Sequence, residues 1–176
     1  LALQYAIQYI QLDFLYIRKV ITMTVQTATL TEYHKLSPDM TVEEGLNVLH
    51  DKKIRIVPVV DGENNYLGMF CYRTLLGKLL PFSAMMEGGL ESLNFTSQTN
   101  EEVREKLEGL LDKKVVEVMD EERPTLTTDM SFWHMLLMIY KYDAPLAVLD
   151  KDTNKMFGVV TKQSSIEDLK RRVPQL

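Results

Sequence analysis

The side chains that most often carry out catalysis or bind metal ions are few and scattered in this chain of 176 residues. The histidines are His34, His50 and His134, and Cys71 is the only cysteine. These four residues do not have the spacing of a zinc site. The sequence also contains no G-x-S-x-G elbow, Walker A loop or G-x-G-x-x-G fingerprint. We therefore expect neither a metal site nor a catalytic site.

The composition points to a soluble globular protein that does not bind nucleic acid. Hydrophobic residues make up 45% of the chain and charged residues 26%, which is ordinary for a folded domain. The net charge of −5 provides no basic field that would attract phosphate backbones. A single cysteine cannot form an intramolecular disulfide, which fits a reducing cytoplasm. Cys71 is expected to be a small buried residue rather than a redox sensor.

Residues 41–72 are predicted to form a helix followed by a β-hairpin, the first elements that could position a binding group. Thr41 and Glu44 have the spacing of a capping box, and the apolar residues that follow recur at helical spacing. Residues 54–60 and 66–72 are predicted to be strands joined by a polar turn. Pro58 is expected to end the first of these strands.

The same order of signals returns about 90 residues later. Residues 127–131 align with residues 37–41, and residues 157–160 align with residues 67–70. Ser131 can cap a helix over the following apolar run, in which Trp133 and the methionines are expected to belong to the core. Neither copy alone could bury both faces of so small a sheet, so we expect the copies to pack together.

Residues 81–114 connect the two copies. Their second half predicts an amphipathic helix, opened by a capping box at Thr99 and Glu102. The residues expected on its buried face are Val103, Leu107, Leu110 and Leu111.

Residues 1–24 are rich in apolar side chains, but glutamines and charged residues interrupt them too often for a membrane span. They also lack the basic region and cleavage site of a signal peptide. We interpret them as an amphipathic helix that packs on the body or on a partner. A helix lying on a membrane surface and an extension upstream of Met23 are the alternatives.

The two copies resemble the CBS domain, which is named after cystathionine β-synthase. The first copy carries the resemblance in SPDMTVEEGLNVL and IRIVPVVDGENNYLGMF. The second carries it in TTDMSFWHMLLMI, PLAVLD and MFGVVTKQS, with Ala147 in place of the strand proline and Pro145 two residues early. In tandem they resemble a CBS pair, or Bateman module, that covers roughly residues 25–80 and 115–172 and leaves a tail of residues 173–176.

The resemblance implies an α+β fold of two pseudo-symmetric β-α-β-β-α repeats packed sheet to sheet. It also implies a homodimer whose inter-repeat clefts can bind AMP, ADP, ATP or S-adenosylmethionine as regulatory ligands, with no cofactor required. Binding in this family regulates a partner rather than turning over a substrate. We therefore expect a non-catalytic, cytoplasmic regulatory protein.

In this family the adenine lies near the strand proline, and an aspartate that closes a Thr/Ser-x-x-Asp motif binds the ribose. Here Thr74 and Ser164 take the place of that aspartate. A neutral hydrogen bond is roughly half as strong as a charge-assisted one, so the resemblance implies weakened binding, with the second copy the better candidate. The ligand-binding candidates are Ser37, Ile56, Val57, Pro58, Thr74, Thr127, Pro145, Leu146, Ala147, Thr161 and Ser164. The phosphate-binding candidates are Arg55, Arg73 and Lys162.

Each of these candidates also has a structural interpretation. Thr74 and Ser164 could simply cap the helices that follow the hairpins. The three basic side chains could be solvated. The alternative function is then a structural interaction module with degenerate clefts that binds a protein partner, or the regulatory fragment of a larger enzyme or transporter.

Overall fold

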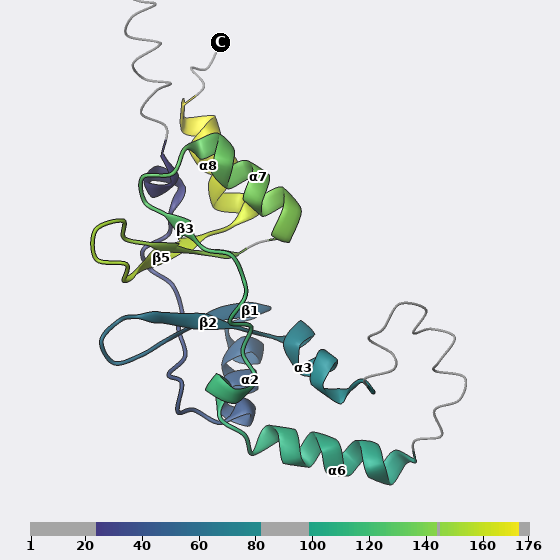
Figure 1. Ribbon diagram of the computed structural model, residues 1–176. Helices are drawn as coiled ribbons and strands as arrows, with labels where there is room; N and C mark the ends of the chain where they lie inside the picture. Colours follow the sequence, from purple (N-terminus) through teal and green to yellow (C-terminus); the bar gives the residue numbers. More distant parts are fainter. Residues whose placement is uncertain (1–23, 82–98, 144, 173–176) are drawn as a thin grey trace, which may run out of the picture. The chain divides into compact units, whose positions relative to one another are not determined.

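The computed structural model describes residues 24–81, 99–143 and 145–172 of the chain (Figure 1). The helix predicted for residues 1–24 and the tail of residues 173–176 lie outside the described residues, apart from Thr24. The chain divides into two compact units. The first-repeat unit comprises the described parts of Glu32–Pro124 and Asn154–Met156. The second-repeat unit comprises the described parts of Leu1–Thr31, Thr125–Thr153 and Phe157–Leu176.

The first-repeat unit is organised around a two-stranded antiparallel sheet. Its elements in chain order are α2 (Val42–Asp51), β1 (Ile56–Val60), β2 (Tyr66–Cys71), α3 (Tyr72–Leu79), α6 (Asn100–Leu111) and the 3₁₀-helix η3 (Val115–Glu117). The predicted capping box of α2 is confirmed: the Glu44 N–H donates to the Thr41 hydroxyl at 3.2 Å, and the Thr41 N–H donates to the Glu44 carboxylate at 2.8 Å. The side chains that fill the core come from α2, both strands, α6 and η3.

The second-repeat unit has a three-stranded sheet in the order β3-β4-β5. Its elements are the 3₁₀-helix η1 (Val25–Ala28), β3 (Leu126–Thr127), α7 (Phe132–Tyr142), β4 (Leu146–Leu149), β5 (Met156–Val160) and α8 (Lys162–Arg172). β3 runs parallel to β4, and α7 and α8 lie on the same face of the sheet (Figure 1). The Ser131 hydroxyl accepts the His134 N–H at 3.2 Å, so the predicted cap of α7 is confirmed. The predicted α+β fold is confirmed in both units.

Each repeat packs with the segment that precedes the other repeat in the chain, and these contacts recur at an offset of 90 residues. Val25 donates its N–H to Met130 at 2.9 Å in the second-repeat unit, and Val115 donates its N–H to Met40 at 2.8 Å in the first. Val25 and Val115 are both fully buried. The predicted repeat is therefore present in backbone pairing as well as in sequence.

Two pairs of non-glycine residues with positive φ follow the same offset. Lys53 and Asp143 come just after the helices α2 and α7, with φ of 54° and 64°. Asn64 and Asn154 lie in the two hairpin turns, with φ of 68° and 57°. Asparagine tolerates this left-handed region better than most residues, which explains its use in both turns.

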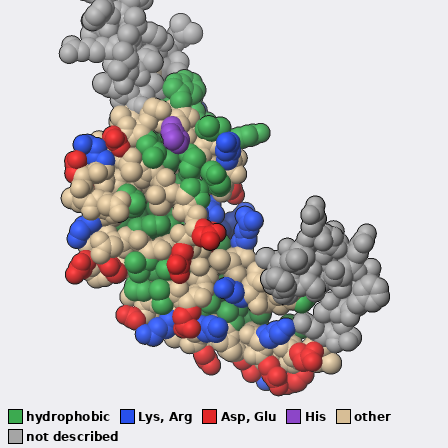
Figure 2. All heavy atoms as spheres, in the orientation of Figure 1, with side chains coloured by type: hydrophobic (Ala, Val, Ile, Leu, Met, Phe, Trp, Pro, Cys, Tyr) green, Lys and Arg blue, Asp and Glu red, His purple; other side chains and the backbone are tan. Residues whose placement is uncertain are grey.

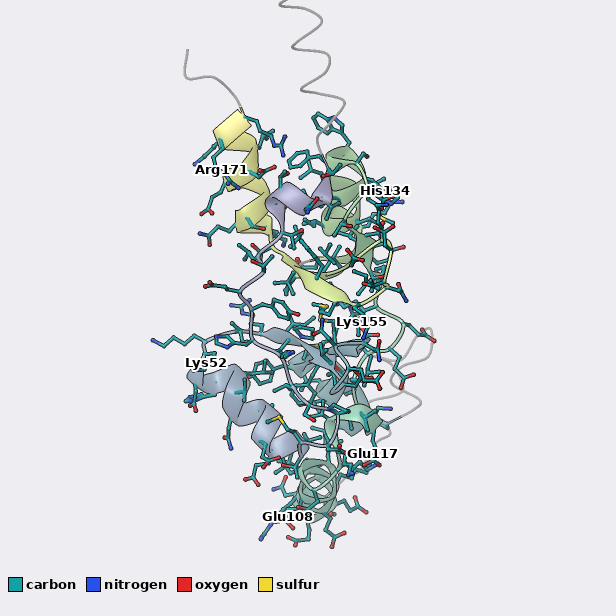
Figure 3. The ribbon with its side chains drawn as sticks, turned by 90° about the vertical axis from the view of Figure 1, so that its left-hand side faces the viewer. Lys52, Glu108, Glu117, His134, Lys155 and Arg171 are labelled. Atoms are coloured by element: carbon teal, nitrogen blue, oxygen red, sulfur yellow. The ribbon has the colours of Figure 1, made fainter. Side chains whose placement is uncertain are left out.

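A buried carboxylate joins η1 to α8 in the second-repeat unit. Asp168 is 3% exposed and accepts hydrogen bonds from the Thr27 hydroxyl at 3.2 Å and from the Arg172 guanidinium at 2.7 Å. Arg171, labelled on α8 in Figure 3, adds a longer bond at 3.3 Å. The guanidinium of Arg172 also lies 5.9 Å from the ring centre of Phe132 on α7. One ion pair thus links three elements, and the sequence pattern did not reveal it.

The sequence predictions for the buried face of α6 and for Trp133 are wrong. Val103 and Leu107 are 45% and 41% exposed, and only the end of α6, at Leu110, is fully covered by α2 and α3. Trp133 is 65% exposed rather than part of the core.

Pro58 lies inside β1, opposite Met69, and does not end the strand. Its carbonyl accepts the Leu36 N–H at 3.0 Å, on the side away from β2. Because the N and C=O of one strand residue face the same way, the missing proline N–H costs the β1–β2 ladder nothing.

Candidate functional site

The junction between β5 and α8 holds the better of the two predicted ribose positions. The Ser164 N–H donates to the Thr161 hydroxyl at 2.9 Å, and the Thr161 N–H donates to the Ser164 hydroxyl at 3.0 Å. Thr161 is therefore the N-cap of α8, and Ser164 is the third helical residue, 5% exposed. Ser164 is therefore not itself the N-cap, as its structural interpretation had it, but its hydroxyl completes a reciprocal cap with Thr161.

The junction between β2 and α3 is built differently. Cys71 occupies the N-cap position, but its side chain accepts no backbone N–H from the first turn of the helix. Thr74 is again the third helical residue, and its hydroxyl donates to the Cys71 carbonyl at 2.9 Å. Thr74 is therefore not the N-cap of α3, which was one of its two interpretations, because the helix begins directly after the strand and Cys71 holds that position. Cys71 is buried, as expected, and its sulfur lies 3.0 Å from the Thr74 hydroxyl.

The predicted adenine-binding positions fall at the starts of β1 and β4. Val57, Leu146 and Ala147 are fully buried in their own units, so they present no surface to a ligand. Ile56 and Pro145, one step earlier, are half-buried and present accessible apolar surface.

Ser37 and Thr127 lie at the other end of the strands. Leu36 pairs with Val59 near the end of β1, and Thr127 pairs with Leu149 at the end of β4. The Thr127 hydroxyl donates to Asp129 at 2.6 Å, and this bond lowers the pKa of the Asp129 carboxyl. Within each unit the structure therefore does not bring Ser37 and Thr127 together with the strand-to-helix junctions.

The predicted phosphate-binding side chains are exposed, and each lies next to a junction. Arg55 immediately precedes Ile56, which pairs with Cys71, so Arg55 and Arg73 share one edge of the first-repeat sheet. Lys162 is the first residue of α8 and forms an ion pair with Asp143. The backbone of Asp143 has φ 64° and ψ 165°, a conformation that is strained for a residue with a side chain.

These observations define a second-repeat edge formed by Asp143, Pro145, Thr161 and Lys162. β4 and β5 are neighbours in the sheet, and the ion pair ties the residues before β4 to the start of α8. The edge combines an apolar ring, a cation and the first turn of an eleven-residue helix, whose positive dipole end favours anions. The sequence analysis named Pro145, Thr161 and Lys162 as candidates but not Asp143. Its position between a predicted helix and a predicted strand was the only feature of the sequence that could have pointed to it.

The described residues contain no group of three or more histidine, cysteine, aspartate or glutamate side chains placed to hold a metal ion. His134, labelled in Figure 3, lies exposed on α7. Within the same described ranges, no helix is both long and apolar enough to cross a membrane.

Comparison with known proteins identifies a domain in the first repeat. Residues 25–81 match the model of the CBS domain. No curated protein matches the chain.

Solved structures match over most of the chain. The CBS-pair protein CBSX2 from Arabidopsis thaliana is 20% identical, with a TM-score of 0.60 over 85% of this chain and 95% of its own. CBSX2 has also been solved in complex with AMP, with a TM-score of 0.62 at 18% identity over 85% of this chain and 97% of that one. CbpB, solved in complex with c-di-AMP, has a TM-score of 0.63 at 13% identity over 89% of this chain and 90% of its own. At these identities the likeness shows the fold.

Proposed function

Because residues 25–81 match the CBS domain and the chain has the fold of CBS-pair proteins, we propose that it is a non-catalytic regulatory module. Its ligand is an adenosine-containing nucleotide or S-adenosylmethionine. Binding favours one arrangement of the protein over another and so alters the activity of a protein partner.

The observation that supports this proposal best is the second-repeat edge. A phosphate there would meet Lys162 and the first turn of α8, while the half-buried ring of Pro145 offers an apolar surface for a base. AMP and c-di-AMP, which were solved with CBSX2 and CbpB, share adenosine and phosphate, the chemistry this edge suits.

Isothermal titration of the whole chain with AMP, ADP, ATP, c-di-AMP and S-adenosylmethionine tests the proposal. We expect heat with at least one nucleotide, and we expect Lys162→Ala to weaken its binding about tenfold, since a charge-assisted hydrogen bond contributes roughly 1.5–3 kcal/mol. Lys170→Ala, an exposed lysine at the other end of α8, is the matched control and should bind normally. Absence of heat with all five compounds would contradict the proposal that the ligand contains adenosine.

The hydrogen bonds of Thr74 and Ser164 favour a second candidate function. Both hydroxyls are engaged within the first turn of a helix, and neither copy has the ribose carboxylate. The alternative is an interaction module that binds its protein partner without a nucleotide. It predicts superimposable thermal unfolding curves with and without each nucleotide, since a ligand that binds only the folded state must raise the melting temperature.

The same proposal includes a homodimer in the cytoplasm. The lone cysteine supports a reducing compartment, and the fold is shared with a family whose modules commonly dimerise. Sedimentation equilibrium of the whole chain measures the assembly, and a monomer mass across the micromolar range would contradict it. Whether the chain works alone or as the regulatory part of a larger enzyme or transporter would follow from the length of the natural gene product.

A further inference from the structure

Helix α7 presents an apolar stripe to solvent. Trp133, Leu137 and Tyr140 are 65%, 51% and 87% exposed, and their spacing of four and then three residues places them along one side of the helix. The buried residues Phe132 and Met135 point elsewhere, into the core. Figure 2 shows hydrophobic side chains gathered at the surface in the region of α7.

The fold does not require this stripe. The helix α2 occupies the same place in the first repeat, 90 residues earlier. Its corresponding residues are Glu43, Asn47 and His50, all exposed and polar. An exposed row of two aromatic side chains and a leucine on α7, where α2 carries polar residues, is typical of a surface that another segment covers.

The chain that precedes the described residues joins the body beside this stripe. Thr24 forms an antiparallel bridge with Ser131, the N-cap of α7, and the Val25 N–H donates to Met130 at 2.9 Å. The first described residue, Thr24, thus lies beside the N-cap of α7, which is two residues before Trp133.

The sequence of residues 1–22 has a matching pattern. Apolar residues recur at alternating spacings of four and three, at Leu3, Ile7, Ile10, Phe14, Ile17 and Ile21. This is the spacing of a seam that packs against a second helix at a shallow angle, and the stripe on α7 follows the same spacing. The stripe extends over roughly 10 Å of helix, whereas 22 helical residues extend over about 33 Å. The segment is thus long enough to cover it.

We propose that residues 1–22 form a helix that lies antiparallel to α7 and covers Trp133, Leu137 and Tyr140. The direction follows from the anchor: Thr24 is next to the start of α7, so a preceding helix that lies along α7 would run antiparallel to it. A segment tethered at the edge of its own site has a high effective concentration there, which favours it over a second copy of the chain. This inference is independent of the proposed ligand.

Trp133 is the only tryptophan of the chain, so its fluorescence reports on the stripe directly. The whole chain is compared with a chain that begins at Met23, each at several concentrations and with its mass measured by light scattering. We expect the whole chain to emit at shorter wavelength and to be quenched by acrylamide about half as strongly, because a docked aromatic ring loses much of its exposed area. Both readings should be independent of concentration.

A matched pair of variants of the whole chain separates docking from other effects. Leu137→Asp, on the stripe, should raise the quenching to the level of the shorter chain. Ile166→Asp, on α8 and equally 51% exposed, should leave it unchanged. Circular dichroism confirms that each variant is folded.

Three outcomes would overturn the proposal. Equal quenching of the whole and the shorter chain would show that residues 1–22 do not cover the stripe. Protection that rises with protein concentration in both chains would assign the stripe to a second copy. Protection that appears only after vesicles of phosphatidylcholine and phosphatidylserine are added would assign residues 1–22 to a membrane surface.

Discussion

At the level of single residues, Tyr66 combines a packed ring with a hydroxyl that has no exposed surface and no hydrogen-bond partner among the described residues. Burial raises the pKa of Tyr66 to about 12, with Asp120 adding to the shift and Arg123 opposing it. An unsatisfied buried hydroxyl costs about 1–3 kcal/mol, so we expect Tyr66→Phe to raise the free energy of unfolding by about 1 kcal/mol.

Urea unfolding measures this change. Tyr72→Phe is the control, because the Tyr72 side chain is exposed, and it should fall within about 0.5 kcal/mol of the parent. If Tyr66→Phe instead weakened the protein, the hydroxyl would have to be bonded in solution, for example through a buried water.

Asp168 shows the opposite case, a buried carboxylate with every partner in place. Asp168→Ala would leave Arg172, only 21% exposed, without its anion and would remove one of the hydrogen bonds of Thr27 on η1. Removing one member of a buried pair costs about 3–5 kcal/mol, so we expect a loss of at least the lower figure in chemical unfolding. The neighbouring Glu167→Ala changes an exposed residue and should cost only a few tenths. Similar losses for both variants would mean that Asp168 acts only through helix propensity.

At the level of elements, local patterns in the sequence predicted the helices and hairpins well. The capping boxes at Thr41 and Thr99 depend on backbone and side chains three residues apart, so spacing alone reveals them. The start of α8 was misplaced because Thr161 and Ser164 are equally good caps, and only the tertiary course of β5 decides between them.

The candidate site was less predictable than the elements that carry it. Lys162 and Pro145 were predicted as candidates from the resemblance, but the Asp143–Lys162 ion pair joins residues 19 positions apart and has no local signal. The exposure of Trp133 and Val103 was missed because helical periodicity gives the apolar face of a helix but not what covers it.

Two glycines that are 90 residues apart, Gly68 and Gly158, lie where each repeat contacts the segment that precedes the other repeat in the chain. A Cβ added at Gly68 would lie 2.8 Å from the carbonyl oxygen of Asp120, and one at Gly158 would overlap the carbonyl of Leu30. Because the obstacle in both cases is backbone, we expect Gly68→Ala and Gly158→Ala each to cost about 1–3 kcal/mol in thermal unfolding. Gly62→Ala, with nothing within 4 Å, is the matched control and should be neutral or slightly stabilising. A neutral Gly158→Ala would contradict the contact with Leu30.

The two hairpin turns should weaken in acid. The Asp61 carboxylate accepts from the Asn65 side chain and from the N–H groups of Asn65 and Glu63, and these bonds hold its pKa below the ordinary value. Asp150 accepts the Thr153 N–H at 2.8 Å in the second turn, and its pKa is lowered in the same way.

In the unfolded chain an aspartate titrates near pH 3.9. Since the folded pKa is lower, the stabilisation is present above the unfolded value and is lost as pH falls through it toward the folded value. We expect the melting temperature to fall less steeply with acid in Asp61→Asn than in the parent, measured by calorimetry between about pH 3 and 6. Parallel curves for the two proteins would show that Asp61 does not contribute to the acid sensitivity.

At the level of the whole molecule, the sequence repeats and the compact units do not have the same boundaries. The CBS-domain match covers residues 25–81, yet η1 belongs to the second-repeat unit and η3 to the first. Leu110, Val115 and Val118 all contribute to the core of the first-repeat unit, although they follow its last strand by about 40 residues or more. A boundary drawn from the repeat alone therefore cuts through both cores.

This difference predicts which fragment can fold. We expect residues 32–124 to unfold cooperatively, because they keep these three core residues and the paired bonds between Met69 and Asp120, at 3.0 and 2.7 Å. Residues 25–81 lose them and gain only η1, whose partners lie in the other unit, so we expect no cooperative transition. Thermal denaturation followed by circular dichroism, with amide dispersion in a proton–nitrogen spectrum, distinguishes the two. A cooperative transition for residues 25–81, or none for residues 32–124, would contradict this expectation. It would mean that the segments around η1 and η3 contribute little to the stability of the cores in which they lie.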